Sequence, residues 1–205
     1  MINEIVLAKQ GDPRLDSQTM FGMYRLRHMV FHDRLGWEVN SDEGMERDEF
    51  DLDEAVYVLV KGEESHVEGC WRLLPTTGPY MLKDVFPQLL DGKPAPERHD
   101  VWELSRFALD TNGREGERFG LSATPVKMVQ SAVQFAKQNG IKRYVSVTSV
   151  AIERMFRRLG VTVTRLGSPI RIGRVLTVAC TLEIDEDTEF ALFGTLPEQA
   201  ERVAA

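Results

Sequence analysis

Arg27 lies on the side of a predicted helix that should face the core. Between residues 17 and 35, apolar side chains such as Met23, Val30 and Phe31 recur at three- and four-residue steps, which places them on one stripe of a helix. Arg27 falls within this stripe. Because a buried guanidinium needs paired carboxylates, we expect it to use the acidic side chains that follow, which are Glu46, Asp48, Glu49 and Asp51.

This pattern has two interpretations, and spacing alone leaves both open. The ion pairs can serve only to hold the helix to the following loop. Alternatively, the charges form a polar site for a zwitterionic or cationic ligand, because clustered ionisable groups are common at functional sites.

Two predicted strands carry further charges among apolar neighbours. Arg72 shares a strand face with Cys70 and Leu74. In the strand expected over residues 101–109, strict alternation puts Glu103 and Ser105 on one face. It puts Arg106 on the opposite face, with Trp102 and Leu104. A carboxylate on a core face should either be paired or have a raised pKa.

His28 and His32 have the i,i+4 spacing of metal ligands on a helix. A metal site needs at least one further ligand nearby, and the sequence offers no evident candidate. We therefore expect no metal. No cofactor is expected either.

The remaining pattern predicts an α/β protein. Ser17 is the expected N-cap of the first helix and Gly36 its stop. Strands are expected over residues 2–9, 55–60, 67–74, 101–109, 141–148, 161–166 and 175–184, and helices over 82–90, 124–140 and 149–159. The order predicts a mixed sheet with helices on both faces.

The bulk composition is that of an ordinary globular protein. The chain has 205 residues, 42% hydrophobic and 28% charged, which suits one domain over residues 1–205. We find no signal peptide and no apolar run of membrane-spanning length. Cys70 and Cys180 are expected as buried free thiols of a cytoplasmic protein.

The charge is unevenly distributed. The net charge of the chain is −7, yet residues 111–174 hold 12 Lys and Arg against 3 Asp and Glu, a net of +9. Such a block attracts nucleic acid, anionic membranes or acidic proteins. Because the block contains no nucleic-acid motif that we recognise, the charge alone makes an acidic protein partner at least as plausible as nucleic acid. The partner that we expect is an acidic protein, with neither nucleic acid nor membrane insertion.

Four motifs in order, YRLRHMVFHDRLGW, GMERDEFD, RLLPTTGPYML and WELSRF, resemble the acyl-homoserine-lactone synthases, the autoinducer synthases of bacterial quorum sensing. The resemblance covers nearly the whole chain. It implies a GNAT-like three-layer α/β/α sandwich around a twisted mixed sheet. It also implies a reaction in which the amine of S-adenosylmethionine attacks an acyl-acyl carrier protein, followed by lactonisation with release of methylthioadenosine.

The resemblance also implies site residues. Expected contacts to S-adenosylmethionine are Arg27, Phe31, Trp37, Asp48, Asp51 and Arg72. Expected catalytic residues are Glu103, as the base that deprotonates the amine, with Ser105 and Arg106 beside it. Packing is the alternative role for the two aromatics, and rigidification of the loop the alternative for Asp48 and Arg106.

The acyl chain is expected in an apolar tunnel between the sheet and the later helices. Its expected lining is Met81, Phe86, Trp102, Leu104, Met128, Val147, Thr148, Ile152 and Met155. Thr148 matches a family threonine linked to accepting a 3-oxo group. Docking of the acidic carrier protein is expected on Lys142, Arg143, Arg154, Arg157 and Arg158.

Two other classes of protein share the predicted fold. Acetyl-CoA-dependent acetyltransferases usually hold pyrophosphate with a glycine-rich turn that opens a helix. The corresponding segment here, RFGLSATP from Arg118, does not match that turn. A sensor that binds S-adenosylmethionine without turnover is the other alternative.

Overall fold

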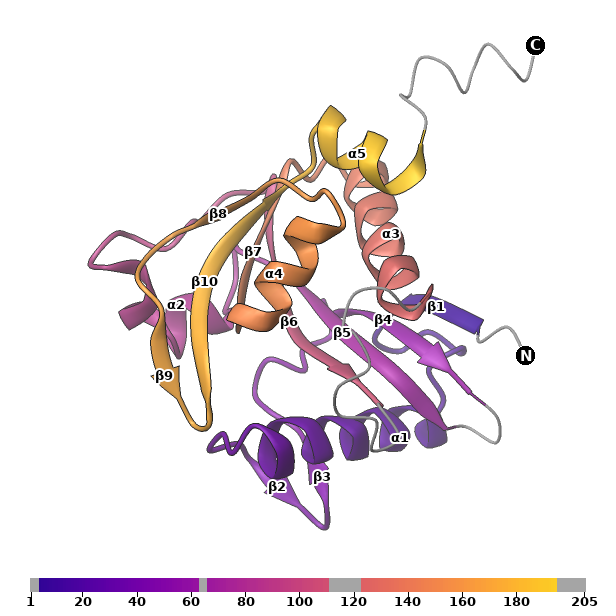
Figure 1. The fold of residues 1–205 in the computed structure, drawn as a ribbon. Helices are drawn as coiled ribbons and strands as arrows, with labels where there is room; N and C mark the ends of the chain where they lie inside the picture. The colour runs from indigo at the N-terminus through magenta and orange to yellow at the C-terminus, as the bar shows by residue number, and fades with distance from the viewer. Residues whose placement is uncertain (1–3, 63–65, 111–122, 195–205) are drawn as a thin grey trace, which may run out of the picture.

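The computed structural model describes residues 4–62, 66–110 and 123–194, and its core is one twisted mixed sheet (Figure 1). The strand order is β1-β4-β5-β6-β7-β10-β8, with β9 also paired to β10. The bounds are β1 Glu4–Lys9, β4 Val56–Lys61, β5 Val67–Pro75, β6 Val101–Leu109, β7 Arg143–Ser149, β8 Val163–Arg165, β9 Ile170–Ile172 and β10 Val175–Glu183. A separate hairpin joins β2, Ser41–Asp42, to β3, Met45–Glu46.

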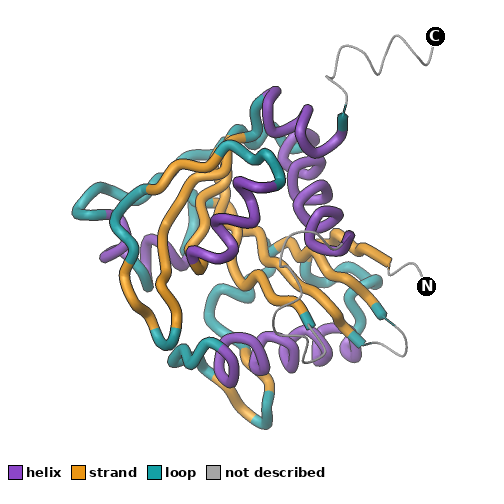
Figure 2. Tube along the Cα trace, in the orientation of Figure 1, coloured by secondary structure: helices purple, strands orange, loops and turns teal. Residues whose placement is uncertain are grey.

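Helices cover both faces of this sheet, and Figure 2 shows the strands as a central band with helices around it. One face packs against α1 (Ser17–Arg27) and the other against α3 (Ala123–Gln138) and α4 (Val150–Arg158). Two apolar clusters fill the space between the layers. The shorter elements are α2 Met81–Asp84, a 3₁₀ turn Pro87–Leu90 and α5 Glu186–Phe193. The predicted strands and the layered arrangement are confirmed, whereas β9, the β2–β3 hairpin and α5 were not predicted.

The first helix differs from the prediction at its N-cap and in the geometry of its last turns. Its N-cap is Asp16 rather than Ser17, because the Asp16 carboxylate accepts the Thr19 N–H at 2.8 Å. After Arg27 the helix widens into a π-helix over His28–Arg34, with Leu35 N–H donating to the Val30 carbonyl. Insertions of this kind change which side chains share a face and are frequent at functional sites. Gly36, with φ +64°, ends the helical segment as expected.

Strands β6 and β7 form the one parallel pair among the described strands. They are paired only from Val101 and Arg143 to Leu104 and Ser146, and beyond these residues they diverge. At the same level β6 contains a bulge, because its register with β5 shifts between Cys70 and Arg72. The sheet therefore opens between β6 and β7 near its centre.

Both cysteines are free and buried, as predicted. Within the described ranges, no helix combines the length and the hydrophobicity that crossing a bilayer requires.

Candidate active site

The buried Arg27 forms ion pairs with carboxylates of the acidic segment. Its Nε donates to Glu46 Oε2 at 2.5 Å and its Nη1 donates to Asp51 Oδ1 at 2.6 Å. Asp48 Oδ2 lies 3.6 Å from its Nη2. Arg27 and Glu46 are fully buried, so the end of α1 is tied to the β3 strand and the loop that follows it.

Arg72 extends the same cluster from the centre of β5. Its Nη1 donates to Asp48 Oδ1 at 2.5 Å and to Asp51 Oδ1 at 2.9 Å, and its Nε donates to Ser105 Oγ at 3.1 Å. The Tyr57 hydroxyl also donates to Asp51, at 2.8 Å. Asp51 is therefore a junction that joins three elements of the fold.

Arg106 completes the cluster because its backbone departs from regular strand geometry. Its φ is +59°, in the left-handed region that is costly for a residue with a Cβ. This bulge turns the side chain onto the face of Glu103 and Ser105, where Nη2 donates to Glu46 Oε1 at 2.8 Å and lies 2.7 Å from Asp48 Oδ2. The prediction that Arg106 points to the opposite face was wrong, because strict alternation fails at a bulge.

The cluster contains three guanidiniums and three carboxylates, so its formal charges balance. Burial alone would raise the pKa of Asp51, but the ion pairs with Arg27 and Arg72 outweigh it and hold that pKa well below its usual range. For Asp48, burial is likewise outweighed by Arg72 and Arg106, and its pKa is also lowered. Both carboxylates are therefore ionised at neutral pH.

A cavity of about 450 Å³ lies against one edge of this cluster. Asp48 and Arg106 reach its wall, whereas Arg27, Asp51 and Arg72 lie behind that wall. Aromatic and apolar side chains form much of the remaining surface. The lining residues are Gly36, Trp37, Glu38, Val39, Asn40, Asp48, Glu49, Phe50, Met81, Val85, Phe86, Arg106, Ile172 and Gly173.

A second, narrow cavity of about 40 Å³ occupies the opening between β6 and β7. It shares Trp37, Met81, Phe86 and Arg106 with the large cavity, so the two are neighbours. Its other lining residues are Phe31, Leu35, Leu104, Ser105, Phe107, Ser146, Val147, Thr148, Ser149 and Ile152. Because these come from both faces of the sheet, the narrow cavity passes through the opening between the strands.

The tip of the β9–β10 hairpin forms part of the large cavity. Gly173 has φ +57°, and a Cβ at this position would lie 2.6 Å from the carbonyl oxygens of Leu35 and Gly36. Arg174 donates its N–H to the Leu35 carbonyl at 2.9 Å and its Nη1 to the Asp33 carbonyl at 2.8 Å. The hairpin thus holds the end of the π-helix, which leads directly into Trp37.

Glu103 is fully buried beside the cluster, and its carboxylate has a different set of partners. Its oxygens accept the Met81 N–H at 3.0 Å and the Leu82 N–H at 2.7 Å, so it anchors the first turn of α2. Burial raises the pKa of Glu103 to about 7, against the opposing effect of these two amides. Neither cavity is lined by Glu103.

Comparison with known proteins identifies this architecture. A sequence profile described as autoinducer synthase matches residues 14–192. The acyl-homoserine-lactone synthase of Ralstonia solanacearum is 45% identical over 186 residues, 89% of this chain and 90% of that protein. The chain belongs to the autoinducer synthases, the acyl-homoserine-lactone synthases.

Solved structures agree with this membership and confirm the expected GNAT-like fold. The crystal structure of the synthase LasI superposes with a TM-score of 0.85 at 36% identity, covering 95% of this chain and 96% of that one. A CoA-dependent synthase, BjaI, whose structure was solved with SAM and isopentyl-CoA, gives 0.80 at 28% identity, covering 94% and 88%. At least one structural relative of this chain is therefore CoA-dependent.

In this synthase, the residues expected to bind S-adenosylmethionine fall into two groups. Asp48 and Trp37 line the large cavity, and Phe31 lines the narrow one, with its ring centroid 5.5 Å from that of Trp37. Arg27, Arg72 and Asp51 are brought into the same cluster but contact other protein groups. Glu46 was not among the expected site residues, but it belongs to the cluster because it joins Arg27 to Arg106. Its position in the acidic segment was the one feature of the sequence that could have suggested this role.

Most of the expected acyl-chain residues gather at the narrow cavity. The six that line it are Met81, Phe86, Leu104, Val147, Thr148 and Ile152. Met128 and Met155 are buried in the neighbouring core between the sheet and the α3 and α4 helices. Trp102 packs edge-on against Phe135 on the same side, with ring centroids 5.4 Å apart. These three line neither cavity.

The five expected docking residues, Lys142, Arg143, Arg154, Arg157 and Arg158, are all exposed. Two of them are already paired: Arg143 lies 2.7 Å from Glu183 and Arg157 lies 3.1 Å from Glu153. The segment RFGLSATP, which argued against an acetyltransferase, lies partly outside the described residues, since 118–122 are not among them.

Proposed function

We propose that this synthase makes an N-acyl-homoserine lactone from S-adenosylmethionine and an acyl-acyl carrier protein. The observation that carries the proposal is the pair of adjoining cavities, one large and charged, the other narrow, largely apolar and set in the opening between β6 and β7. Such a pair suits a reaction that joins a charged, water-soluble substrate to an acyl chain.

S-adenosylmethionine fits the large cavity on chemical grounds. It carries an ammonium, a sulfonium and a carboxylate, so a complementary pocket needs fixed charges of both signs. Asp48 and Arg106 supply them at the wall, and Trp37 supplies an aromatic surface. We propose that Arg27, Arg72, Asp51 and Glu46 act as positioning residues, because they are buried behind the wall and hold Asp48 and Arg106 in place.

The acyl chain is proposed to enter the narrow cavity beside Leu104, Val147 and Ile152. Thr148 offers a hydroxyl there, which suits recognition of a 3-oxo group. Longer chains would need more room, and Met128 and Met155 lie in the core between the sheet and the α3 and α4 helices. Because unbranched methionine side chains adapt readily to irregular spaces, we propose that these two, with Trp102, bound the far end of the chain.

The reaction then proceeds in two bond exchanges. The neutral amine of S-adenosylmethionine attacks the thioester carbonyl, forming the C–N bond of the amide and releasing the carrier thiol. The carboxylate of the acylated S-adenosylmethionine next attacks the carbon of the methionine side chain that is bonded to the sulfonium sulfur. The C–O bond of the lactone forms, the C–S bond breaks, and methylthioadenosine is released. The ammonium must lose a proton first, and Glu103, with a pKa near 7, is the proposed acceptor, acting through a water molecule because it lines neither cavity.

A carrier protein is the donor that the surface charge favours. The α4 helix starts at the narrow cavity, since Ser149 and Ile152 both line it, and it presents Arg154 and Arg158 to solvent. Acyl carrier proteins are acidic, so this exposed cationic surface beside the acyl cavity suits their docking.

The test compares donors with purified protein and S-adenosylmethionine. Octanoyl-carrier protein and octanoyl-CoA are supplied separately, while free thiol release and lactone formation are measured. We expect higher kcat/KM with the carrier protein, and a salt-dependent KM for it. Equal or better use of octanoyl-CoA would overturn the donor assignment, and absence of lactone with both donors would overturn the activity itself.

The docking surface is tested by the double variant Arg154→Glu with Arg158→Glu. It should raise the KM for octanoyl-carrier protein and leave that for S-adenosylmethionine unchanged. A matched control is the double variant Lys9→Glu with Arg25→Glu, which alters the net charge equally at exposed positions on β1 and α1. Equal effects of the two double variants on the carrier KM would contradict docking on α4.

A further inference from the structure

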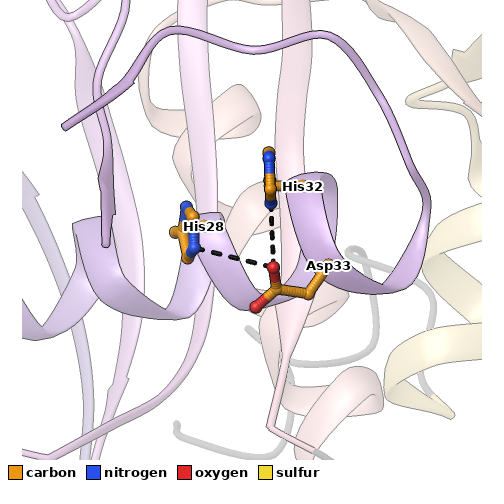
Figure 3. Close-up of side chains that lie close together, drawn as sticks. All are labelled: His28, His32 and Asp33. Carbon is orange, nitrogen blue, oxygen red and sulfur yellow. Dashed lines mark hydrogen bonds and ion pairs between the residues drawn. The ribbon is translucent and has the colours of Figure 1, made fainter. Parts of the chain in front are cut away.

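The π-helix brings together three side chains that the proposed reaction does not use. His28, His32 and Asp33 place one nitrogen or oxygen atom each within 4.8 Å of one another. Asp33 Oδ1 lies 2.8 Å from His32 Nδ1 and 3.6 Å from His28 Nε2. Figure 3 shows that both imidazole rings direct a nitrogen toward this same carboxylate oxygen.

The wider helical turn explains why Asp33 joins the histidines. In an α-helix, His28 and His32 share a face, but a residue five positions after His28 is displaced from it. The π-helix repeats its hydrogen bonds at i,i+5, which brings Asp33 above His28 while His32 stays beside it, with the two ring centroids 4.7 Å apart.

The hydrogen bonds of Ser41 determine which nitrogen of His28 is free. The Ser41 hydroxyl donates to the Met45 carbonyl at 3.1 Å, so its oxygen accepts from His28 Nδ1–H at 2.5 Å. In the neutral ring, Nε2 is then an unprotonated acceptor, and it faces the carboxylate of Asp33, which is also an acceptor. A metal ion placed between these two acceptors would accept a lone pair from each of them.

We propose that His28 Nε2, His32 Nδ1 and Asp33 Oδ1 form a site for a divalent transition-metal ion of the zinc class. Imidazole with a carboxylate is a donor set that such ions favour. Tetrahedral Zn²⁺ separates its ligand atoms by about 3.4 Å, close to the 3.6 Å between His28 Nε2 and Asp33 Oδ1. His32 is 54% exposed, so its ring has room to turn onto the ion.

Two outer contacts already orient this site. Ser41 holds His28 in the required tautomer, which is the usual arrangement for a metal-bound histidine. Arg174 holds the main chain of Asp33 through its carbonyl at 2.8 Å. Three protein ligands leave a fourth position open to water, and the exposure of His32 and Asp33 gives the ion a path from solvent.

The ion would bind to one side of the π-helix, and residues on its other side and just after it line the two cavities. Phe31 lies within the π-helix and lines the narrow cavity, and Trp37 follows its end. A metal that crosslinks His28 to Asp33 should therefore stabilise this segment.

The experiment uses untagged full-length protein freed of metal by a chelator. ZnCl₂ is titrated by calorimetry, and CoCl₂ by the visible absorption that distinguishes tetrahedral Co²⁺. We expect one saturable site and a zinc-dependent rise in melting temperature. Ser41→Ala should weaken binding by about 10- to 100-fold, and His32→Ala should abolish the saturable site. His99→Ala, at an exposed histidine outside the cluster, serves as control and should bind like wild type.

Circular dichroism confirms that each variant is folded before titration. Saturable binding that persists unchanged in His32→Ala would overturn the site, because the ion would then be bound elsewhere. Wild-type protein without a saturable site would also overturn it.

Discussion

Replacing Glu46 by glutamine keeps the size of the side chain and removes its charge from the centre of the ionic cluster. Glu46 accepts from Arg27 at 2.5 Å and from Arg106 at 2.8 Å, and it is fully buried. The glutamine oxygen can accept from one guanidinium, but its NH₂ group then faces the other as a second donor. Three buried guanidiniums would remain with two carboxylates.

The size of the effect follows from this imbalance. Removing one partner of a buried ion pair costs about 3–5 kcal/mol. In a protein of this length each kcal/mol lowers the melting temperature by about 2–4 °C, so we expect a decrease of about 6–20 °C. Since Arg106 would lose a contact that holds its left-handed backbone in place, the KM for S-adenosylmethionine should also rise.

Thermal unfolding followed by circular dichroism measures the stability, and lactone formation measures the kinetics. Glu54→Gln, at an exposed position in a turn, is the matched control and should change stability by less than about 0.5 kcal/mol. In the Glu46→Gln background, Arg106→Met removes one excess positive charge, so the two changes should couple favourably by about 0.5–3 kcal/mol. A Glu46→Gln melting temperature equal to that of the control would refute the charge-balance argument.

Three further predictions concern single positions. Because burial raises the pKa of Glu103 to about 7, the folded protein holds a proton that the unfolded chain releases, and stability should fall by about 3 kcal/mol as pH rises from about 4.5 to 7. The free energy of unfolding of Glu103→Gln, measured with denaturant, should lack this dependence on pH. Its kcat should fall by about 10²- to 10⁴-fold. Near-wild-type turnover would show that Glu103 only anchors α2. Thr148→Val should lower the ratio of 3-oxo to unsubstituted lactones measured by mass spectrometry, and an unchanged ratio would remove its hydroxyl from acyl recognition. Gly173→Ala should raise the KM for S-adenosylmethionine, because its Cβ would displace the hairpin from the cavity wall. The control is Gly140→Ala, which has a similar φ of +68° but lies in open space, and it should leave that KM unchanged. An equal rise of the KM in both variants would contradict the argument.

Local patterns in the sequence were sufficient for most elements of the fold. The apolar runs of β4 and β5 and the alternation in the first half of β6 predicted strands because side-chain period depends only on neighbouring residues. The same periodicity exposed Arg27 and Arg72 as charges in apolar surroundings. The carboxylates that pair with them could be narrowed to the acidic segment, but spacing could not choose among its members.

Tertiary structure decided the features that depend on partners distant in sequence. The left-handed backbone of Arg106 reverses the alternation of β6, and nothing local to WELSRF requires it; the buried carboxylates of Glu46 and Asp48 compensate its cost. Likewise, the wider turn of the π-helix brings Asp33 to His28, although their sequence spacing indicated no third ligand. Periodicity is a property of a regular backbone, so it fails where long-range contacts stabilise an irregular one, and here those irregular places are the walls of the candidate site.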